Sequence, residues 1–321
     1  MLEALKKKYV FSGEVGQGGM AKIYRAIEKT TGRIVAIKLL RPDNKDSHRN
    51  QRRFRSEIQA IKAIRSPYVV AAFDYAWNDQ VQYIAMEYID GSILKEYIGR
   101  RGNLTVDEAV EFAKQIALGL HEMHQVGIIH RDIKASNIMI TDHGQVKIID
   151  LGIALHDETD RVTQTDNIIG SVQYLAPELL EKEEANAQTD IYALGILLYE
   201  MLIGDVPFKE KTGIDTARKH QTSTVPHVNK IFKNIPQAVA NIVIRATAKK
   251  PHHRYSTAYN LYEDLDTCLS DKRLYEPVYQ LGDKLRKTWI EKINSSAFWL
   301  VVGLTVIALL IAIVIVLIVV K

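Results

Sequence analysis

Eight consecutive residues in the middle of the chain, His130 to Asn137, carry the side chains of a catalytic loop. Asp132 is a possible base, Arg131 and Lys134 are cations, and the amide of Asn137 is a group that can bind a metal ion. Apolar runs lie directly before and after this octet. A charged loop between two apolar runs is typical of functional residues that a rigid scaffold positions. The other interpretation is a solvated turn, so the role of the octet depends on what the rest of the chain supplies.

Two further charged residues stand in apolar surroundings. Lys38 is the only charge in the expected strand 34–40, and Asp150 directly follows the apolar strand expected at 146–149. Burying a lone cation is costly unless an anion meets it, so Lys38 predicts a bound anion. A carboxylate at the end of a strand suits a metal ligand, although a turn-forming Asp would look the same. Glu57 lies beside the apolar face of a helix expected over 46–65, where it could approach Lys38 or remain a solvated charge.

A glycine-rich stretch joins the first two expected strands. Residues 16–21 read Gly-Gln-Gly-Gly-Met-Ala. Glycines let backbone N–H groups approach a polyphosphate closely. A plain flexible turn would show the same pattern, so this stretch is weak evidence by itself.

The elements that must position these residues change in type along the chain. The first part predicts an antiparallel sheet with one helix, and its strands are expected at 9–15, 22–28, 34–40, 69–77 and 81–88. Residues 89–92 break the pattern and form a candidate link between two lobes. The second part is mainly helical and opens with the capping box of Thr105 and Glu108. Later helices are expected at 190–203, 236–249 and 256–269. The fold class is therefore α+β.

Composition excludes several classes of protein. A net charge of +4 is too small and too dispersed to predict a nucleic-acid-binding protein. The single cysteine, Cys268, excludes an internal disulfide, and its apolar helical surroundings predict a core position.

The C-terminal segment 297–320 has the composition of a membrane-spanning helix. It carries no charge, and Thr305 is its only polar residue. About 20 apolar residues span a bilayer as a helix. Cations gather in the stretch before it, which predicts that this side faces the cytoplasm; they are Lys284, Arg286, Lys287 and Lys292. We therefore expect a juxtamembrane linker at 271–296 and a single-pass protein of the cell membrane.

In type, order and spacing, the pieces resemble a eukaryotic-type protein kinase over roughly residues 9–270, with a small lobe at 9–88 and a large lobe at 92–270. The matching residues are Gly16-Gln17-Gly18-Gly19-Met20-Ala21-Lys22-Ile23, Val35-Ala36-Ile37-Lys38, Glu57, His130 to Asn137, Asp150-Leu151-Gly152, Ala176-Pro177-Glu178, Asp190 and Arg254. The first loop, Met86-Glu87-Tyr88 and residues 170–175 are similar to those of bacterial membrane-anchored Ser/Thr kinases of the PASTA kind. The extracellular repeats of that group are absent from this sequence, which puts sensing by this polypeptide in doubt.

The resemblance implies ATP-dependent transfer of phosphate to Ser or Thr hydroxyls, with Mg²⁺ as the metal and Mn²⁺ as the alternative. It implies that Asp132 accepts the hydroxyl proton, Lys134 neutralises the γ-phosphate and Lys38, held by Glu57, contacts the α- and β-phosphates. Asn137 and Asp150 would ligate the metal. The residues implied in nucleotide binding are Val15, Gly16, Gln17, Gly18, Gly19, Met20, Ala21, Lys22, Ile23, Lys38, Glu87 and Tyr88.

The resemblance also implies regulation. Arg131 would bind a phosphorylated activation segment, and Thr163 and Thr165 are the expected autophosphorylation sites. Glu178 and Arg254 would form a buried ion pair in the large lobe. Relatives dimerise through the small lobe, so a homodimer is expected.

Two other functions fit the same fold. A membrane-tethered pseudokinase scaffold would bind nucleotide or partners without transfer, but the presence of all four residues with chemical roles argues against it; these are Lys38, Asp132, Asn137 and Asp150. A small-molecule kinase is disfavoured because residues 156–178 resemble the activation segment and the Ala-Pro-Glu motif of enzymes that bind peptides.

Overall fold

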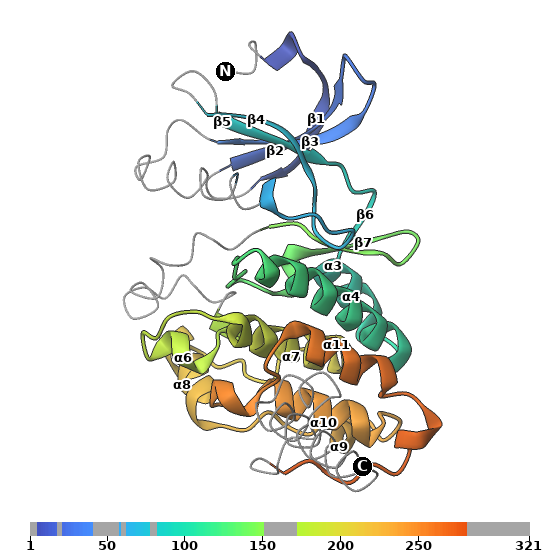
Figure 1. Ribbon diagram of the computed structural model, residues 1–321, viewed down its shortest axis with the longest axis vertical. Helices are drawn as coiled ribbons and strands as arrows, with labels where there is room; N and C mark the ends of the chain where they lie inside the picture. The colour runs from blue at the N-terminus through green and yellow to red at the C-terminus, as the bar shows by residue number, and fades with distance from the viewer. Residues whose placement is uncertain are drawn as a thin grey trace, which may run out of the picture. The chain divides into compact units, whose positions relative to one another are not determined.

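The structure, a computed structural model, describes residues 5–17, 21–40, 58, 62–77, 82–150 and 172–280. All of them belong to one unit that spans residues 1–281. Figure 1 shows strands β1 to β5 together in one lobe and the helices from α3 onward in the other. The expected helix 46–65 falls mostly, and the expected membrane segment 297–320 wholly, outside the described residues. Within the described ranges, no helix has the length and hydrophobicity needed to cross a membrane.

The small lobe is an antiparallel five-stranded sheet in the order β1-β2-β3-β5-β4. Its strands are β1 (Tyr9–Gln17), β2 (Ala21–Glu28), β3 (Ile34–Leu40), β4 (Ala72–Trp77) and β5 (Gln82–Glu87). The expected strands are confirmed in number and position except at the start of the fourth. Val69 instead forms an isolated parallel bridge with Ile148 of the large lobe, and the N–H of Val70 donates to the carbonyl of Ile148. The apolar run 69–77 is therefore shared between the two lobes.

A second, smaller sheet lies beside the link between the lobes. It consists of β6 (Gly91–Ile93), β7 (Ile138–Thr141) and β8 (Val146–Ile148), in that order and antiparallel. Only β8 was predicted from the sequence, because β6 and β7 are too short to show an alternating pattern. The sheet connects the residues that follow the link to the residues that follow the charged octet. The octet is thus fixed by β7 at its C-terminal end.

The helices of the large lobe surround α7. The α-helices are α3 (Leu94–Arg101), α4 (Val106–Gln125), α6 (Pro177–Leu180), α7 (Ala187–Ile203), α8 (Gly213–Thr222), α9 (Val228–Ile231), α10 (Gln237–Ala246) and α11 (Ala258–Thr267). Short 3-10 turns are η1 (Ala135–Asn137), η3 (Val172–Tyr174), η4 (Pro251–His253) and η5 (Asp271–Arg273). Helix α7 is buried on nearly all sides and contacts α4, α10 and α11. A helix that is apolar all round belongs in the centre of a domain.

The predicted helix signals of the large lobe are confirmed. Thr105 Oγ1 accepts from the N–H of Glu108 at 3.2 Å, and Glu108 Oε2 accepts from the N–H of Thr105 at 3.2 Å. Helix α7 ends at Gly204, which takes a left-handed φ of 96°. Cys268 is 1% exposed, as its apolar surroundings predicted.

The predicted ion pair of Glu178 and Arg254 is confirmed and fully buried. The two Arg254 terminal nitrogens each contact one Glu178 oxygen at 2.7 Å, and Arg254 is 1% exposed. The remaining N–H groups of Arg254 donate to backbone carbonyls, including that of Ala248 at 2.7 Å. A buried pair is tolerated only when its other donors are satisfied in this way.

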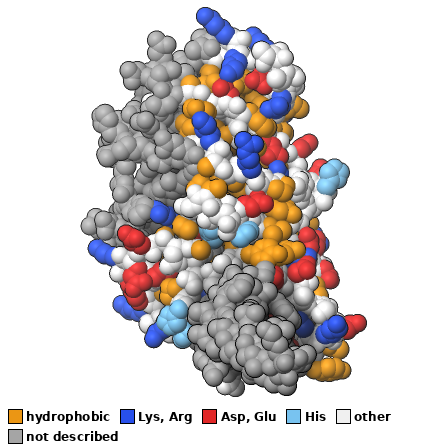
Figure 2. Space-filling model, in the orientation of Figure 1, with side chains coloured by type: hydrophobic (Ala, Val, Ile, Leu, Met, Phe, Trp, Pro, Cys, Tyr) orange, Lys and Arg blue, Asp and Glu red, His pale blue; other side chains and the backbone are white. Residues whose placement is uncertain are grey.

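Charges on the face drawn in Figure 2 are mixed. Among the described residues there, side chains of Lys and Arg and of Asp and Glu are both visible. This distribution fits the small net charge of the chain.

Candidate active site

Asp190, at the start of α7, holds the charged octet in place. Its side chain is fully buried. One carboxylate oxygen accepts from the N–H of His130 at 2.8 Å and lies 2.8 Å from His124 Nε2, and the other accepts from the N–H of Arg131 at 2.7 Å. Hydrogen bonds to a carboxylate are stronger than neutral ones. They stabilise the backbone of Arg131 in its left-handed conformation, with φ of 70°, which is costly for a residue with a Cβ.

His130 is a structural member of the loop. It is completely buried, and burial lowers the pKa of its imidazole below the usual value. The neutral ring accepts a hydrogen bond from the N–H of Asp132 to Nδ1 at 3.2 Å. The ring therefore fixes the backbone of the residue that is the candidate base.

Asp132, Lys134 and Asn137 lie together, as the octet predicted. Asp132 Oδ2 accepts from Asn137 Nδ2 at 2.9 Å and pairs with Lys134 Nζ at 2.6 Å. Asn137 Nδ2 also donates to the Asp132 carbonyl at 2.8 Å. Because Nδ2 is used in these bonds, the Asn137 amide oxygen points away from Asp132. The orientation of a carboxylate base and the orientation of a possible metal ligand are thus set by the same contacts.

Lys38 meets an anion, and that anion is Asp150. Lys38 Nζ lies 2.8 Å from Asp150 Oδ1, and Lys38 is 8% exposed. The contact joins β3 of the small lobe to a residue two positions after the end of β8 of the large lobe. A buried cation needs such a partner. Glu57, the predicted partner of Lys38, lies outside the described residues, so that pairing stays a prediction.

The glycine-rich stretch lies at the end of a strand pair. Gly16 pairs with Ile23 and Gln17 with Lys22, after a bulge between Glu14 and Gly16. Val15 is half exposed although apolar, and Ala21 is buried. Gly18, Gly19 and Met20 fall outside the described residues. The two strands therefore remain paired up to the edges of the predicted phosphate loop.

Glu87 and Tyr88, predicted to contact nucleotide, have side chains that are engaged with the protein. Glu87 accepts from Lys147 Nζ at 2.8 Å, and Arg25 lies 5.3 Å from the centre of the Tyr88 ring. A nucleotide would therefore bind to the backbone of this segment and not to these two side chains. Lys147 was missed in the sequence reasoning, although it stands alone in the apolar strand β8 as Lys38 does in β3. That shared pattern could have identified it.

Arg131 has no direct ion-pair partner among the described residues, although the carboxylates of Asp190 and Glu184 are near enough to act on its pKa. It is partly buried, and burial lowers the pKa of its guanidinium. Its Nε is buried without a hydrogen-bond partner, and none of the described ion pairs includes it. Thr163 and Thr165, the predicted phosphorylation sites, lie outside the described residues.

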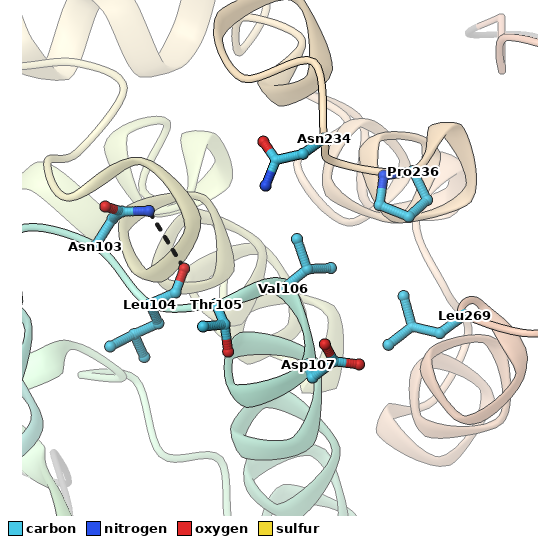
Figure 3. A pocket seen from close by; sticks show the side chains of 8 residues that line it. All are labelled: Asn103, Leu104, Thr105, Val106, Asp107, Asn234, Pro236 and Leu269. Atoms are coloured by element: carbon cyan, nitrogen blue, oxygen red, sulfur yellow. Dashed lines mark hydrogen bonds between the residues drawn. The ribbon is translucent and has the colours of Figure 1, made fainter.

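A cavity of about 580 Å³ lies elsewhere on the large lobe (Figure 3). It lies between the start of α4, the residues before α10 and Leu269, which follows α11. Its lining consists of Asn103, Leu104, Thr105, Val106, Asp107, Asn234, Pro236 and Leu269. The Asn103 amide, drawn in Figure 3, donates to the carbonyl of its neighbour Leu104 at 3.3 Å. None of the residues predicted to do chemistry lines this cavity, so it does not belong to the candidate site.

Comparison with known proteins agrees with this geometry. Residues 9–265 match the family described as protein kinase domain. The chain is 40% identical to the serine/threonine-protein kinase PrkC of Bacillus subtilis over 276 residues, which are 86% of this chain and 43% of that protein. It is 38% identical to the probable serine/threonine-protein kinase PknB of Lactococcus lactis, over 83% of this chain and 43% of that protein. The chain thus spans less than half the length of these relatives.

A solved structure shares the fold. The crystal structure of Rad53 1-466 in complex with AMP-PNP matches with a TM-score of 0.67 and 25% identity, over 81% of this chain and 65% of that one. The family match covers most of the chain and includes every described residue of the candidate site. The chain belongs to the protein kinase family.

Proposed function

We propose that this chain is a serine/threonine protein kinase that transfers the γ-phosphate of ATP to hydroxyl groups of proteins. The observation that carries the proposal is the contact of Asp132 with both Lys134 and Asn137, on a loop fixed by Asp190. It is supported by relatives that are named serine/threonine-protein kinases. The solved neighbour that carries AMP-PNP, an analogue of ATP, supports the nucleotide.

Asp132 is the proposed base. One of its oxygens is held by Lys134 and Asn137, which leaves the carboxylate oriented to accept the proton of a substrate hydroxyl. Lys134, 2.6 Å from that carboxylate, would turn to the transferring phosphate as charge develops there. Phosphoryl transfer needs alignment and charge neutralisation more than covalent help, and these two side chains provide both.

Asn137 and Asp150 fit a magnesium ion. Both offer oxygen atoms, which Mg²⁺ prefers, and the Asn137 amide is oriented with its oxygen away from Asp132. The described residues contain no cluster of three His, Cys, Asp or Glu side chains that could hold a metal by themselves. A magnesium site of one or two protein ligands completed by phosphate oxygens does not need one. When bound, the ion would neutralise charge on the phosphates.

Lys38 would contact the α- and β-phosphates. Asp150, which contacts Lys38 in the described part of the chain, would serve the metal, and Glu57 is the residue that the resemblance assigns to hold Lys38. The paired ends of β1 and β2 would hold residues 16–21 over the phosphates, with half-exposed Val15 available to cover the base. The glycines allow backbone N–H groups to approach the phosphate oxygens.

Arg131 would read the phosphorylation state of the activation segment. A partly buried guanidinium whose Nε lacks a hydrogen-bond partner among the described residues is suited to a phosphorylated Thr163 or Thr165. Such a contact would order the segment next to Asp132. Under this part of the proposal, activity would depend on autophosphorylation of the segment.

The membrane anchor is a further part of the proposal. It rests on the uncharged apolar stretch 297–320 and on the four cations between residues 284 and 292. The kinase domain would face the cytoplasm as part of a single-pass protein of the cell membrane. A homodimer through the small lobe completes the proposal by resemblance, and the shared membrane would raise the local concentration of two copies.

The test is transfer by the whole chain. The reconstituted protein is incubated with Mg·ATP and a generic protein substrate, and phosphosites are mapped by mass spectrometry. We expect phosphate on the substrate and on Thr163 and Thr165, and loss of transfer by at least about a hundredfold in Asp132→Asn. Asp142→Asn, at an exposed turn, is the matched control and should transfer normally. A wild-type chain that transfers no more phosphate than Asp132→Asn would refute the proposal in favour of a pseudokinase scaffold.

A further inference from the structure

The last ten described residues are held on the large lobe by a polar clamp. Arg273 Nη1 contacts Asp264 Oδ1 of α11 at 2.6 Å, and Arg273 Nε contacts Glu276 Oε2 at 2.6 Å. From α10, Asn241 Nδ2 donates to Glu276 at 2.9 Å and to the carbonyl of Pro277 at 2.8 Å. Asn241 Oδ1 accepts from the N–H of Tyr279 at 2.9 Å. We call Asp264, Arg273, Glu276 and Asn241 the clamp.

The residues of the clamp are themselves held by further hydrogen bonds. Asn241 is only 6% exposed and is itself held by Gln237, which in turn accepts from Asn229 at 2.8 Å. Arg273 also donates to the carbonyl of Asp264 at 2.9 Å. The segment was expected to be the start of a connector, but its backbone is hydrogen-bonded to Asn241 of α10, and the side chain of Arg273 is paired with Asp264 of α11.

The clamped segment presents apolar side chains to solvent. Leu274 is 60% exposed, Tyr275 92% and Val278 54%. Leu269, just before the segment, is 40% exposed. Single exposed apolar residues are ordinary, but a group of them within ten residues of chain is a candidate surface for contact with another apolar phase. A loose tail could turn these side chains inward, and the clamp prevents this by bonding the polar groups between them.

The sequence that follows indicates what covers the surface. Between residues 281 and 296 there are four cations and only two carboxylates, and the apolar stretch begins at Ala297. A flexible chain of about 17 residues, the number between Tyr279 and Ala297, would span roughly 25 Å. A bilayer that holds residues 297–320 would therefore lie within reach of the clamped segment. Basic residues beside a membrane favour an anionic surface.

We propose that Leu274, Tyr275 and Val278 form a foot that enters the headgroup region of an anionic bilayer and fixes the α10–α11 end of the kinase domain against the membrane. The inference rests on the proposed membrane anchor. Tyrosine suits this depth because its ring is apolar and its hydroxyl can stay in contact with water. The clamp contributes by keeping the three side chains outward before contact, which lowers the entropy lost on binding.

The experiment places a reporter on the foot. Tyr275→Cys is labelled with an environment-sensitive fluorophore in the full chain, reconstituted in vesicles of phosphatidylcholine and phosphatidylglycerol. Native Cys268 can remain, because it is 1% exposed and burial raises the pKa of its thiol to about 12. Ile214→Cys, on α8 and 53% exposed, is the control position. The readout is quenching by acrylamide, a neutral quencher.

If the foot enters the bilayer, acrylamide should quench the fluorophore at position 275 at least about threefold less than the fluorophore at position 214. Exposure in the free chain predicts the reverse order, since 275 is the more exposed site. Arg273→Gln should restore quenching at position 275, while the midpoint of thermal unfolding stays near that of the parent chain. Unchanged protection of position 275 from the quencher in this variant would overturn the role of the clamp. Equal quenching at the two positions would overturn the foot. So would protection that appears only with many chains in each vesicle, which would indicate a second copy as the cover.

Two controls separate this inference from the proposals on which it depends. A chain that fails to float with the vesicles after a carbonate wash would overturn the anchor and the foot together. A chain that floats and phosphorylates substrate but leaves position 275 open to the quencher would overturn the foot alone.

Discussion

At the scale of single residues, two buried charged groups of the candidate site, Asp190 and Lys38, each have specific partners. Asp190 accepts two backbone N–H groups of the octet, and Lys38 meets Asp150. The same rule explains His220, which has no part in the proposed chemistry. It is 0% exposed, its Nδ1 lies 2.8 Å from the Tyr192 hydroxyl, and Phe208 packs against its ring at 5.0 Å. Such a site accepts only a neutral ring.

His220 makes stability depend on pH. Burial, aided by nearby Lys249, lowers the pKa of His220 from 6.5 to about 3. The unfolded chain therefore binds one more proton at this residue between about pH 6.5 and pH 3. The stability from His220 is complete above pH 6.5 and is lost as pH falls toward 3. His220 contributes at most about 1.4 kcal/mol per pH unit to the slope of the free energy of unfolding against pH.

His220→Gln should flatten that slope. Urea unfolding from pH 7 to about pH 5 is expected to show a smaller loss of stability in the variant than in the parent, although the variant is less stable at pH 7. His143→Gln, at an exposed turn, is the matched control and should keep the parent slope. Parallel curves for parent and His220→Gln would contradict the assignment. His130, whose pKa burial also lowers, accounts for part of the slope that remains.

At the scale of elements, close approach between helices decides where glycine is needed. Gly195 of α7 faces α10, and a Cβ there would lie 2.8 Å from Ala246 Cβ and 2.8 Å from Thr247 Cγ2. These side chains are short and cannot turn away. Gly99 of α3 is also helical, but a Cβ there would meet nothing within 4 Å. The two glycines therefore predict opposite effects of the same substitution.

Gly195→Ala should destabilise the large lobe by about 1–3 kcal/mol, because overpacking outweighs the better helix propensity of alanine. Gly99→Ala should stabilise it by about 0.5–1 kcal/mol, because only the propensity term acts. Urea unfolding of both variants against the parent measures the difference. A Gly195→Ala chain as stable as Gly99→Ala would mean that α7 and α10 separate without cost.

Local elements could be predicted from the sequence, whereas contacts between distant parts of the chain could not. Helices with caps were predictable: Thr105 with Glu108 began α4, and Gly204 ended α7. The site residues Asp132, Lys134 and Asn137 were predictable because they fall within one octet. The pairing of Val69 with Ile148 and the contact of Lys147 with Glu87 were not, because they join residues about 60 to 80 positions apart and leave no periodic signal. Fold class follows from local patterns, whereas contacts between lobes depend on the assembled chain.

At the scale of the whole chain, the two lobes are joined by the backbone link and also by an ion pair between Lys147 and Glu87, which we call the brace. Lys147 of β8 in the large lobe contacts Glu87 at the end of β5 in the small lobe at 2.8 Å. Lys147 is 7% exposed and Glu87 is partly exposed, so the pair is screened less than a surface salt bridge. Glu87 also accepts from the N–H of Ala71 at 3.4 Å. The brace therefore fixes the backbone next to which the proposed nucleotide would bind.

Breaking the brace should weaken nucleotide binding more than it slows transfer. Lys147→Met removes the cation while keeping the apolar length of the side chain, and we expect KM for ATP to rise about three- to tenfold with kcat changed less. Glu87→Gln should act alike. Because both substitutions break one contact, the double variant should be no worse than the worse single variant, with a coupling energy of about 1 kcal/mol. Additive losses, measured by steady-state kinetics on the four proteins, would show that Lys147 and Glu87 act separately.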